Sequence, residues 1–161
     1  MPLITALLHT TNDALRLGRA LETLLPCSEI LIVDHQSADA TLRVAREYGA
    51  RIVPAQDRAT ADDYSGLARH DWIFCLHPAE SITEALQATL FEWSSQPASA
   101  VADAAAFCVL GREQVGEKWL AFAAQETRLV PRSWTQWRGE LPARQTSAVV
   151  LEGELLRFAF P

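Results

Sequence analysis

The first half of the chain alternates short apolar runs with amphipathic segments, and this pattern strongly limits the folds open to it. Apolar runs of strand length occupy residues 3–8, 29–33 and 51–54. Between them, residues 14–25 and 40–48 carry apolar side chains at helical spacing. Strands separated by single helices form a parallel sheet through right-handed crossovers. The sequence therefore predicts an α/β fold, a three-layer sandwich with a mostly parallel central sheet.

Capping signals predict where these helices begin and end. Asn12 or Asp13 is expected to cap the first helix, and Asp39 the second. Gly49 stands where a glycine commonly terminates a helix. Residues 55–70 are polar and lack clear periodicity, so we expect a loop or a weak helix there.

The rest of the chain begins with one more strand and helix and then changes character. The apolar run 72–76 is the best candidate for the centre of the sheet. Ser81 followed by Glu84 predicts a capping box for a helix that continues to about residue 94. After it, we expect short strands separated by loops, at 104–110, 129–130, 149–151 and 155–160.

Length and charge exclude several classes of protein. With 161 residues the chain fits one domain, which we predict to span residues 1–161. A net charge of −6 provides no basic face for a nucleic acid. No apolar run approaches the roughly 18 residues of a membrane span. Three widely spaced cysteines without a CxxC pair indicate buried thiols in a reducing compartment, so a cytoplasmic location is expected.

Three of the predicted strands end in polar segments, at residues 9–12, 34–39 and 77–80. The carboxyl ends of parallel strands meet at one edge of a sheet, where open α/β folds bind their ligands. The chain contains neither GxGxxG nor GxxxxGK[ST], which excludes the glycine-rich phosphate cradles of Rossmann and P-loop proteins. We therefore expect a pocket in which side chains hold the base and ribose of a nucleotide.

Several segments resemble, in order, the motifs of family 2 glycosyltransferases. VDHQSADAT at 33–41 resembles VDSGSTDGT, and LETLLP at 21–26 resembles L-E-S-L-x-P. DWIFCLHPAE at 71–80 resembles the motif G-D-W-x-L-x-L-D-A-D-E. ETRLV at 126–130 and WRGEL at 137–141 are similar to x-x-R-L-F and W-x-G-x-V of the bacterial lipopolysaccharide-type branch. The resemblance implies a glycosyltransferase A (GT-A) fold and a nucleotide-sugar donor, a UDP-sugar in the first instance.

The resemblance also implies a set of nucleotide-binding residues, namely Thr11, Asp34, Ser37 and His77. Asp34 corresponds to a family residue that contacts the uracil edge. A structural interpretation of Asp34, as a strand-end group bonded to the next loop, is equally open. In the family, Mn²⁺ or Mg²⁺ bridges the donor diphosphate, so one of these ions is the cofactor to be expected.

The departures from the family motifs concern its acidic residues. His77 and Ala79 replace the two aspartates that hold ribose and metal. Alanine offers no ligand atom, and histidine is a softer donor than Mg²⁺ prefers. Ala143 replaces an acidic residue near the acceptor. Glu80 and Glu140 are the remaining candidates for a catalytic carboxylate, and His77 with Glu80 the remaining candidates for metal binding.

The histidines allow one further metal hypothesis. His35 and His77 both follow strand ends and, together with Glu80, form a candidate metal site. His9 and His70 are predicted to be surface or loop residues.

Three functions remain open at this point. The first is a sugar transferase that acts on an unknown acceptor. The second is a catalytically inactive glycosyltransferase relative, which would serve as a binding or regulatory module for a protein partner. The third is an unrelated small α/β domain.

Overall fold

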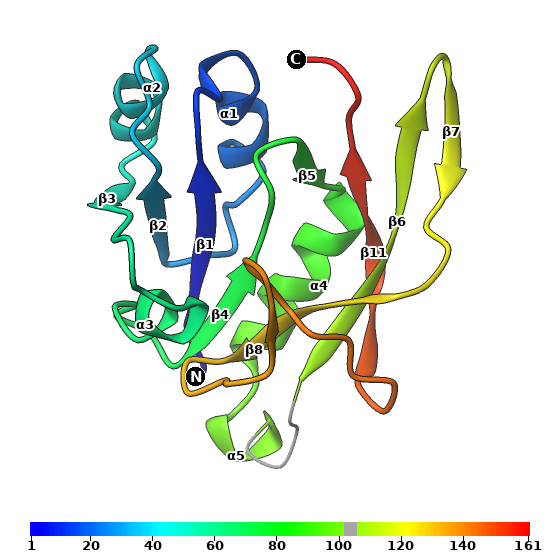
Figure 1. The fold of residues 1–161 in the computed structure, drawn as a ribbon. Helices are drawn as coiled ribbons and strands as arrows, with labels where there is room; N and C mark the ends of the chain where they lie inside the picture. The colour runs from blue at the N-terminus through cyan, green and yellow to red at the C-terminus, as the bar shows by residue number, and fades with distance from the viewer. Residues whose placement is uncertain (102–105) are drawn as a thin grey trace.

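A computed structural model describes residues 1–101 and 106–161, and a nine-stranded sheet runs through it (Figure 1). The strand order is β3-β2-β1-β4-β8-β6-β11-β5, and β7 pairs with β6 at the side of this path. The helices are α1 (Ala14–Leu21), α2 (Thr41–Glu47), α3 (Ala61–Ser65), α4 (Glu84–Ser95) and α5 (Ala98–Val101). The strands are β1 (Ile4–Thr10), β2 (Glu29–Asp34), β3 (Arg51–Pro54), β4 (Trp72–Cys75), β5 (Glu80–Ile82), β6 (Phe107–Val115), β7 (Lys118–Ala121), β8 (Glu126–Pro131), β9 (Trp137–Arg138), β10 (Leu141–Pro142) and β11 (Val149–Arg157).

The first half of the chain confirms the predicted parallel sheet. Strands β3, β2, β1 and β4 are parallel neighbours, and α1 and α2 are the crossovers between them. Strand β4 lies between β1 and β8, which confirms the prediction that residues 72–76 form the centre of the sheet. The predicted α/β architecture with a mostly parallel sheet is therefore correct.

Two apolar cores lie on the two faces of the sheet. The first core contains Ile4, Ala6 and Leu8 of β1 together with buried side chains of α1 and α4. The second core contains Leu7 of β1 and Tyr64 of α3, and the region of β9 and β10 packs against it. Successive residues of a strand point to opposite faces, so alternate residues of β1 enter different cores. This alternation decides which side chains reach the ligand-binding edge.

The second half of the sheet is mixed, and β11 joins its parts. Strand β11 is parallel to β6 and antiparallel to β5. The two short strands predicted at 149–151 and 155–160 are one strand, with an irregularity between Val150 and Glu154. The strand predicted at 104–110 begins in the structure at Phe107, and its first two residues lie outside the described ranges.

Of two helix predictions, the weak helix expected within 55–70 is confirmed and the start of the helix after residue 81 is wrong. Residues 55–70 contain the short helix α3, which begins with a capping box between Thr60 and Asp63. The capping box predicted for Ser81 is wrong, because Ser81 lies in β5 and pairs with β11. Thr83 caps α4 instead.

The caps of α1 and α2 are close to those predicted. Asp13 is the N-cap residue of α1, but its carboxylate binds Thr11 N and Arg16 rather than the helix backbone. Asp39 directly precedes the cap residue of α2, and its carboxylate accepts a hydrogen bond from Thr41 N at 2.9 Å. Gly49 has φ +75°, as a glycine that terminates a helix should.

The Thr83 cap leads to a first prediction. Its hydroxyl accepts hydrogen bonds from Leu86 N at 3.3 Å and from Glu154 N at 3.1 Å, so it holds both α4 and β11. Replacing Thr83 with alanine should lower the free energy of unfolding by about 1 kcal/mol, the usual loss for a helix cap. Urea denaturation measures this. Thr83→Ser keeps the hydroxyl and should stay near the parent value; an equal loss in both variants would contradict the cap.

The three cysteines are free thiols, but Cys27 is half-buried and not buried as predicted. Cys75 and Cys108 are buried, and burial raises the pKa of Cys75 to about 12. A thiol with such a pKa stays protonated at neutral pH and is a poor nucleophile. In the described part of the chain, no helix has the length and apolar character needed to cross a membrane.

Candidate functional site

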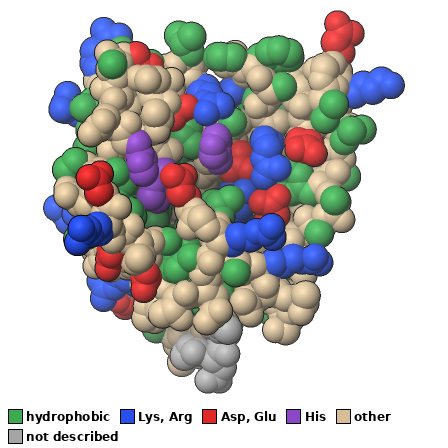
Figure 2. Space-filling model, viewed as in Figure 1, with side chains coloured by type: hydrophobic (Ala, Val, Ile, Leu, Met, Phe, Trp, Pro, Cys, Tyr) green, Lys and Arg blue, Asp and Glu red, His purple; other side chains and the backbone are tan. Residues whose placement is uncertain are grey.

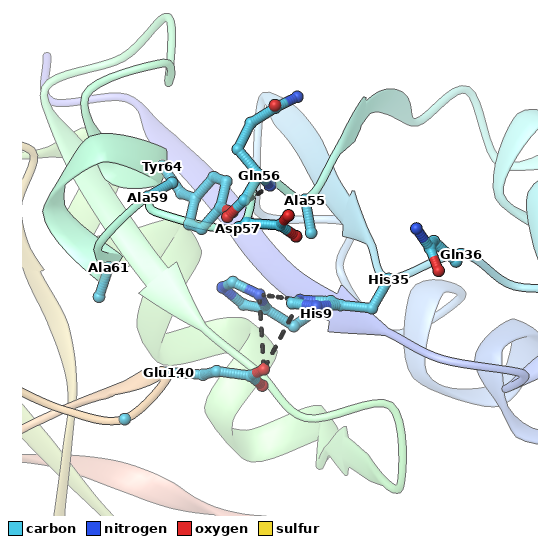
Figure 3. A pocket seen from close by; sticks show the side chains of 11 residues that line it. His9, His35, Gln36, Ala55, Gln56, Asp57, Ala59, Ala61, Tyr64 and Glu140 are labelled. Carbon is cyan, nitrogen blue, oxygen red and sulfur yellow. Dashed lines mark hydrogen bonds and ion pairs between the residues drawn. The ribbon is translucent and has the colours of Figure 1, made fainter.

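A pocket of about 470 Å³ lies at the carboxyl ends of β1, β2 and β3, where the sequence predicts a ligand (Figure 3). We call it the rim pocket. Its floor and walls come from the ends of these strands, from α3 and the loop before it, and from the turn between β9 and β10. The lining residues are His9, His35, Gln36, Ala55, Gln56, Asp57, Ala59, Ala61, Tyr64, Gly139 and Glu140.

Strand alternation brings two histidines together in this pocket. Leu7 of β1 and Val33 of β2 both face the second core, so His9 and His35, two residues further on, face the same side. The two strands are parallel and adjacent, with His9 beside Val33 in the register. As a result the Nδ1 atom of His9 lies 2.9 Å from the Nε2 atom of His35.

The hairpin of β9 and β10 brings a carboxylate to the two histidines. Gly139 has φ +64°, which suits the first central position of a tight hairpin turn, and Glu140 follows it. Trp137 at the start of the hairpin packs against the second core and thereby holds the turn over the pocket. The Oε1 atom of Glu140 lies 3.6 Å from Nδ1 of His9 and 3.7 Å from Nε2 of His35.

The surroundings of His9 favour its neutral form. Burial lowers the pKa of His9, and the neighbouring imidazole of His35 lowers it further, whereas Glu140 opposes both effects. The side chain of His9 is 7% exposed, while those of His35 and Glu140 are 35% and 53% exposed. Figure 2 shows histidine side chains beside acidic ones near the middle of this face. At neutral pH His9 therefore offers a lone pair rather than a positive charge.

Asp34 points away from the rim pocket. Leu8 of β1 and Ile32 of β2 face the first core. Thr10 and Asp34 lie two residues further along these strands, so alternation directs them to the opposite side of the sheet from His9. The Asp34 carboxylate accepts hydrogen bonds from Thr10 Oγ1 at 2.7 Å, Ser37 Oγ at 2.6 Å and Ser37 N at 3.0 Å. Burial would raise the pKa of Asp34, but these hydrogen bonds outweigh it and hold the pKa low. Its contacts match the structural interpretation, a strand-end group bonded to the next loop.

Thr11 and Ser37 belong to the network that fixes the loops after β1 and β2. Asn12 N donates to Ser37 Oγ at 2.9 Å, and Asn12 Oδ1 accepts from Ala38 N at 2.7 Å. Thr11 is exposed, and its backbone N–H donates to Asp13 Oδ2 at 2.8 Å. Thr11 and Ser37 therefore lie in the loops that support the rim pocket, and they are not among the side chains that line it.

His77 lies in a neighbouring pocket of about 310 Å³, which we call the central pocket. His9 and Glu140 line both pockets and form the wall between them. Nδ1 of His77 accepts a hydrogen bond from Ala79 N at 3.0 Å, which fixes the turn after β4. Burial lowers the pKa of His77, partly opposed by Glu80. Arg138 also lines this central pocket and supplies a cation there.

Glu80 lies beneath the turn after β4 and is fully buried. Its Oε1 atom accepts from Arg128 Nη1 at 2.7 Å and from His77 N at 2.8 Å, and its Oε2 atom accepts from Arg128 Nη2 at 2.9 Å. Arg157 also donates to Oε2, at 2.8 Å. These partners give the Glu80 carboxylate a structural role in holding the turn after β4.

The position at which the family resemblance implies a divalent metal does not fit Mg²⁺ or Mn²⁺ here. Ala79 has no donor atom, and His77 already uses one ring nitrogen within its own turn. The carboxylate of Glu80 is paired with guanidinium groups. Mg²⁺ takes oxygen ligands in octahedral geometry, and these residues do not supply them.

The chain has a GT-A-type fold, as the comparison with solved structures shows. No protein-family model matches the chain. A protein of Rickettsia felis described as an uncharacterized glycosyltransferase is 29% identical over 91 residues, which cover 54% of this chain and 32% of that protein. The chain thus spans about a third of this relative's length.

Two solved structures show the same fold. Residues 1–349 of TarS from S. aureus match with a TM-score of 0.53 at 14% identity, covering 72% of this chain and 37% of that one. Mannosyl-3-phosphoglycerate synthase from Rubrobacter xylanophilus matches with a TM-score of 0.51 at 17% identity, covering 73% and 42%. At these identities the likeness establishes the fold alone.

Sequence reasoning missed several residues that line the rim pocket. The prediction that His9 is a surface or loop residue is wrong, because His9 lies within β1, one residue before its end, and its side chain is almost covered. Tyr64, whose hydroxyl accepts a hydrogen bond from Gln56 N at 2.8 Å, comes from the segment 55–70 that lacks periodicity. Because alternate residues of a strand share a face, the buried Leu7 could have indicated that His9 also points inward. The sequence carries no comparable signal for Tyr64.

Proposed function

We propose that this chain is a glycosyltransferase-like domain that binds the nucleotide of a UDP-sugar in the rim pocket. The observation that carries the proposal is a pocket of about 470 Å³ at the carboxyl ends of three parallel strands. Its size lies within the roughly 300–1,000 Å³ of small-molecule sites. Tyr64 and His35 offer ring faces for a base, and Gln56 and Gln36 offer polar groups for its edge.

The central pocket provides a path for the diphosphate of the same donor. It shares His9 and Glu140 with the rim pocket, and Arg138 lines it. In a chain of net charge −6, a guanidinium group is the kind of partner that a diphosphate needs, because charge-assisted hydrogen bonds to phosphate are strong. Complexes of TarS with UDP and with UDP-GlcNAc support the choice of UDP as the first ligand to test.

A second candidate function is a binding or regulatory module that has lost sugar transfer. It is favoured by the replacement of three acidic residues of the family at His77, Ala79 and Ala143 and by the pairing of Glu80 with Arg128. A module of this kind would bind the nucleotide or a protein partner without turning the sugar over. UDP-sugar hydrolysis well above background in the presence of Mn²⁺ would support an active transferase and reject the inactive module.

Calorimetric titration with UDP, in EDTA and again in Mg²⁺, tests the nucleotide pocket. We expect a Kd between about 1 μM and 1 mM, equivalent to roughly −8 to −4 kcal/mol. The two Kd values should agree, because the residues at the family's metal position do not suit Mg²⁺. Absence of binding at millimolar UDP would reject the pocket, and strict dependence on Mg²⁺ would reject the metal-independent mode.

The variant Arg138→Gln tests whether Arg138 binds the diphosphate of UDP. The substitution should weaken UDP binding about tenfold, the equivalent of about 1.4 kcal/mol, and leave uridine binding unchanged. Arg144→Gln is the matched control, because Arg144 is an exposed arginine just after β10 that lines neither pocket. Equal effects of the two variants would mean that only the general charge of this face matters.

A further inference from the structure

We propose that His9, His35 and Glu140 form a binding site for a transition-metal ion of the Zn²⁺ type, in the wall of the rim pocket. The proposal does not depend on nucleotide binding. Two imidazole nitrogens and one carboxylate oxygen converge there from three segments far apart in the sequence, the end of β1, the end of β2 and the turn of the β9–β10 hairpin (Figure 3).

The distances within the cluster fit tetrahedral coordination. The three ligand atoms form a triangle with edges of 2.9, 3.6 and 3.7 Å. Tetrahedral bonds of about 2.0–2.1 Å place neighbouring ligand atoms about 3.3 Å apart. Shifts of a few tenths of an ångström would therefore bring all three atoms to bonding distance of one ion, and the Glu140 side chain, which is 53% exposed, has room to supply much of that shift.

The donor set selects the class of metal. Two nitrogens and one oxygen suit Zn²⁺ and its neighbours Co²⁺ and Ni²⁺, whereas Mg²⁺ and Ca²⁺ prefer oxygen ligands. Two histidines with one glutamate are also the ligands of several zinc enzymes, where the fourth position stays open. Here all three side chains line the rim pocket, so the open position would face its interior.

Without a metal, the same atoms are held by weaker contacts. One imidazole must donate a proton to the other across the 2.9 Å contact, and Glu140 is more than half exposed. Metal binding would replace that shared proton by an ion that accepts electron pairs from both nitrogens. The site would also place a positive charge in a chain whose formal net charge is −6.

The test uses the full chain with Zn²⁺ in competition with a chromogenic chelator, in the absence of nucleotide. We expect one equivalent bound per chain. With Co²⁺ as a spectroscopic substitute, we expect the intense visible bands of tetrahedral coordination without a thiolate charge-transfer band. Stoichiometric binding with thiolate bands would overturn the assignment by pointing to the cysteines, and so would a lack of binding.

Glu140→Gln and His35→Gln test the ligands directly, since both side chains are exposed enough for the fold to tolerate them. Each should weaken Zn²⁺ binding by at least the 10–100-fold typical of losing an outer-shell partner. His70→Gln, a histidine outside the rim pocket, should change nothing. If His70→Gln weakened binding as much, or if His35→Gln did not, the assignment would be overturned. Because UDP binding is measured in EDTA, failure of this site and failure of the nucleotide pocket remain distinguishable.

Discussion

Replacing Arg128 with methionine should lower the free energy of unfolding by about 3–5 kcal/mol, the usual cost of removing one partner of a buried ion pair. Arg128 and Glu80 are both fully buried, and two parallel hydrogen bonds of 2.7 and 2.9 Å join them. The variant leaves the Glu80 carboxylate inside the protein with Arg157 as its remaining cationic partner. Urea denaturation followed by circular dichroism measures the loss.

Two further variants make this prediction specific. Glu80→Gln combined with Arg128→Met removes both buried charges of this ion pair, so the double variant should be more stable than Arg128→Met alone. Arg112→Met removes an exposed pair, Arg112 with Glu154, and should change stability by less than about 1 kcal/mol. A loss in Arg128→Met no greater than in Arg112→Met would show that the buried pair contributes little.

The same pair predicts how acid affects stability. Burial would raise the pKa of Glu80, but Arg128 outweighs burial and lowers the pKa from 4.5 to about 2. A carboxylate with a depressed pKa stabilises the fold above its unfolded pKa, and this contribution disappears as the pH falls from about 4.5 towards 2. The difference corresponds to about 3 kcal/mol. Stability of the parent protein should fall steeply in this range, and less steeply in Glu80→Gln.

The second large effect is expected for Gly153→Ala, by about 3 kcal/mol or more. Gly153 has φ +101°, a conformation that costs other residues about 1–3 kcal/mol, and it lies in the irregular part of β11. An added Cβ would lie 2.5 Å from Leu86 Cα and 2.7 Å from Leu86 Cβ, well inside contact distance. Relief would require α4 to move away from the sheet, which costs a further 1–3 kcal/mol or so.

The variant Gly116→Ala separates the cost of the backbone conformation from the cost of the contact with Leu86. Gly116 also has a positive φ, +62°, but nothing lies within 4 Å of an added Cβ. This variant should therefore lose only the conformational part, about 1–2 kcal/mol. If Gly153→Ala cost no more than Gly116→Ala in thermal or urea unfolding, the close approach of α4 to β11 would not be a source of strain.

Local sequence patterns were sufficient for the parallel half of the sheet. The strands at 29–33 and 51–54 and the position of 72–76 at the centre follow from apolar runs and helical spacing, which act within a few residues. The sequence predicts Ser81 as the cap of α4, whereas the structure has Thr83, because the residues of β5 resemble the start of a helix until their strand partner is known. That partner is β11, about 70 residues further along the chain.

The candidate site was predictable in part. Its location at the strand ends follows from the parallel topology, and strand parity alone separates His9 and His35 from Asp34. The contact of Glu140 with both histidines depends on how a hairpin about 100 residues away docks on the second core. The sequence makes Glu80 a candidate for catalysis or metal binding for the same reason, since its partner Arg128 is 48 positions distant. Packing between distant segments decides such contacts, and no local pattern records it.

The place of β11 inside the sheet has a consequence for the order in which the protein can fold during synthesis. Strand β5 pairs with β11, and the turn that begins α4 donates a hydrogen bond to Glu154 O. The residues of β5 leave the ribosome about 70 residues before β11, a delay of roughly 4–14 seconds at ordinary rates of translation. Strands β1, β2 and β3 have all their strand partners once β4 is made, whereas β4 must wait for β8, and β5 and β6 must wait for β11. During those seconds the unpaired edges are open to pairing with other chains.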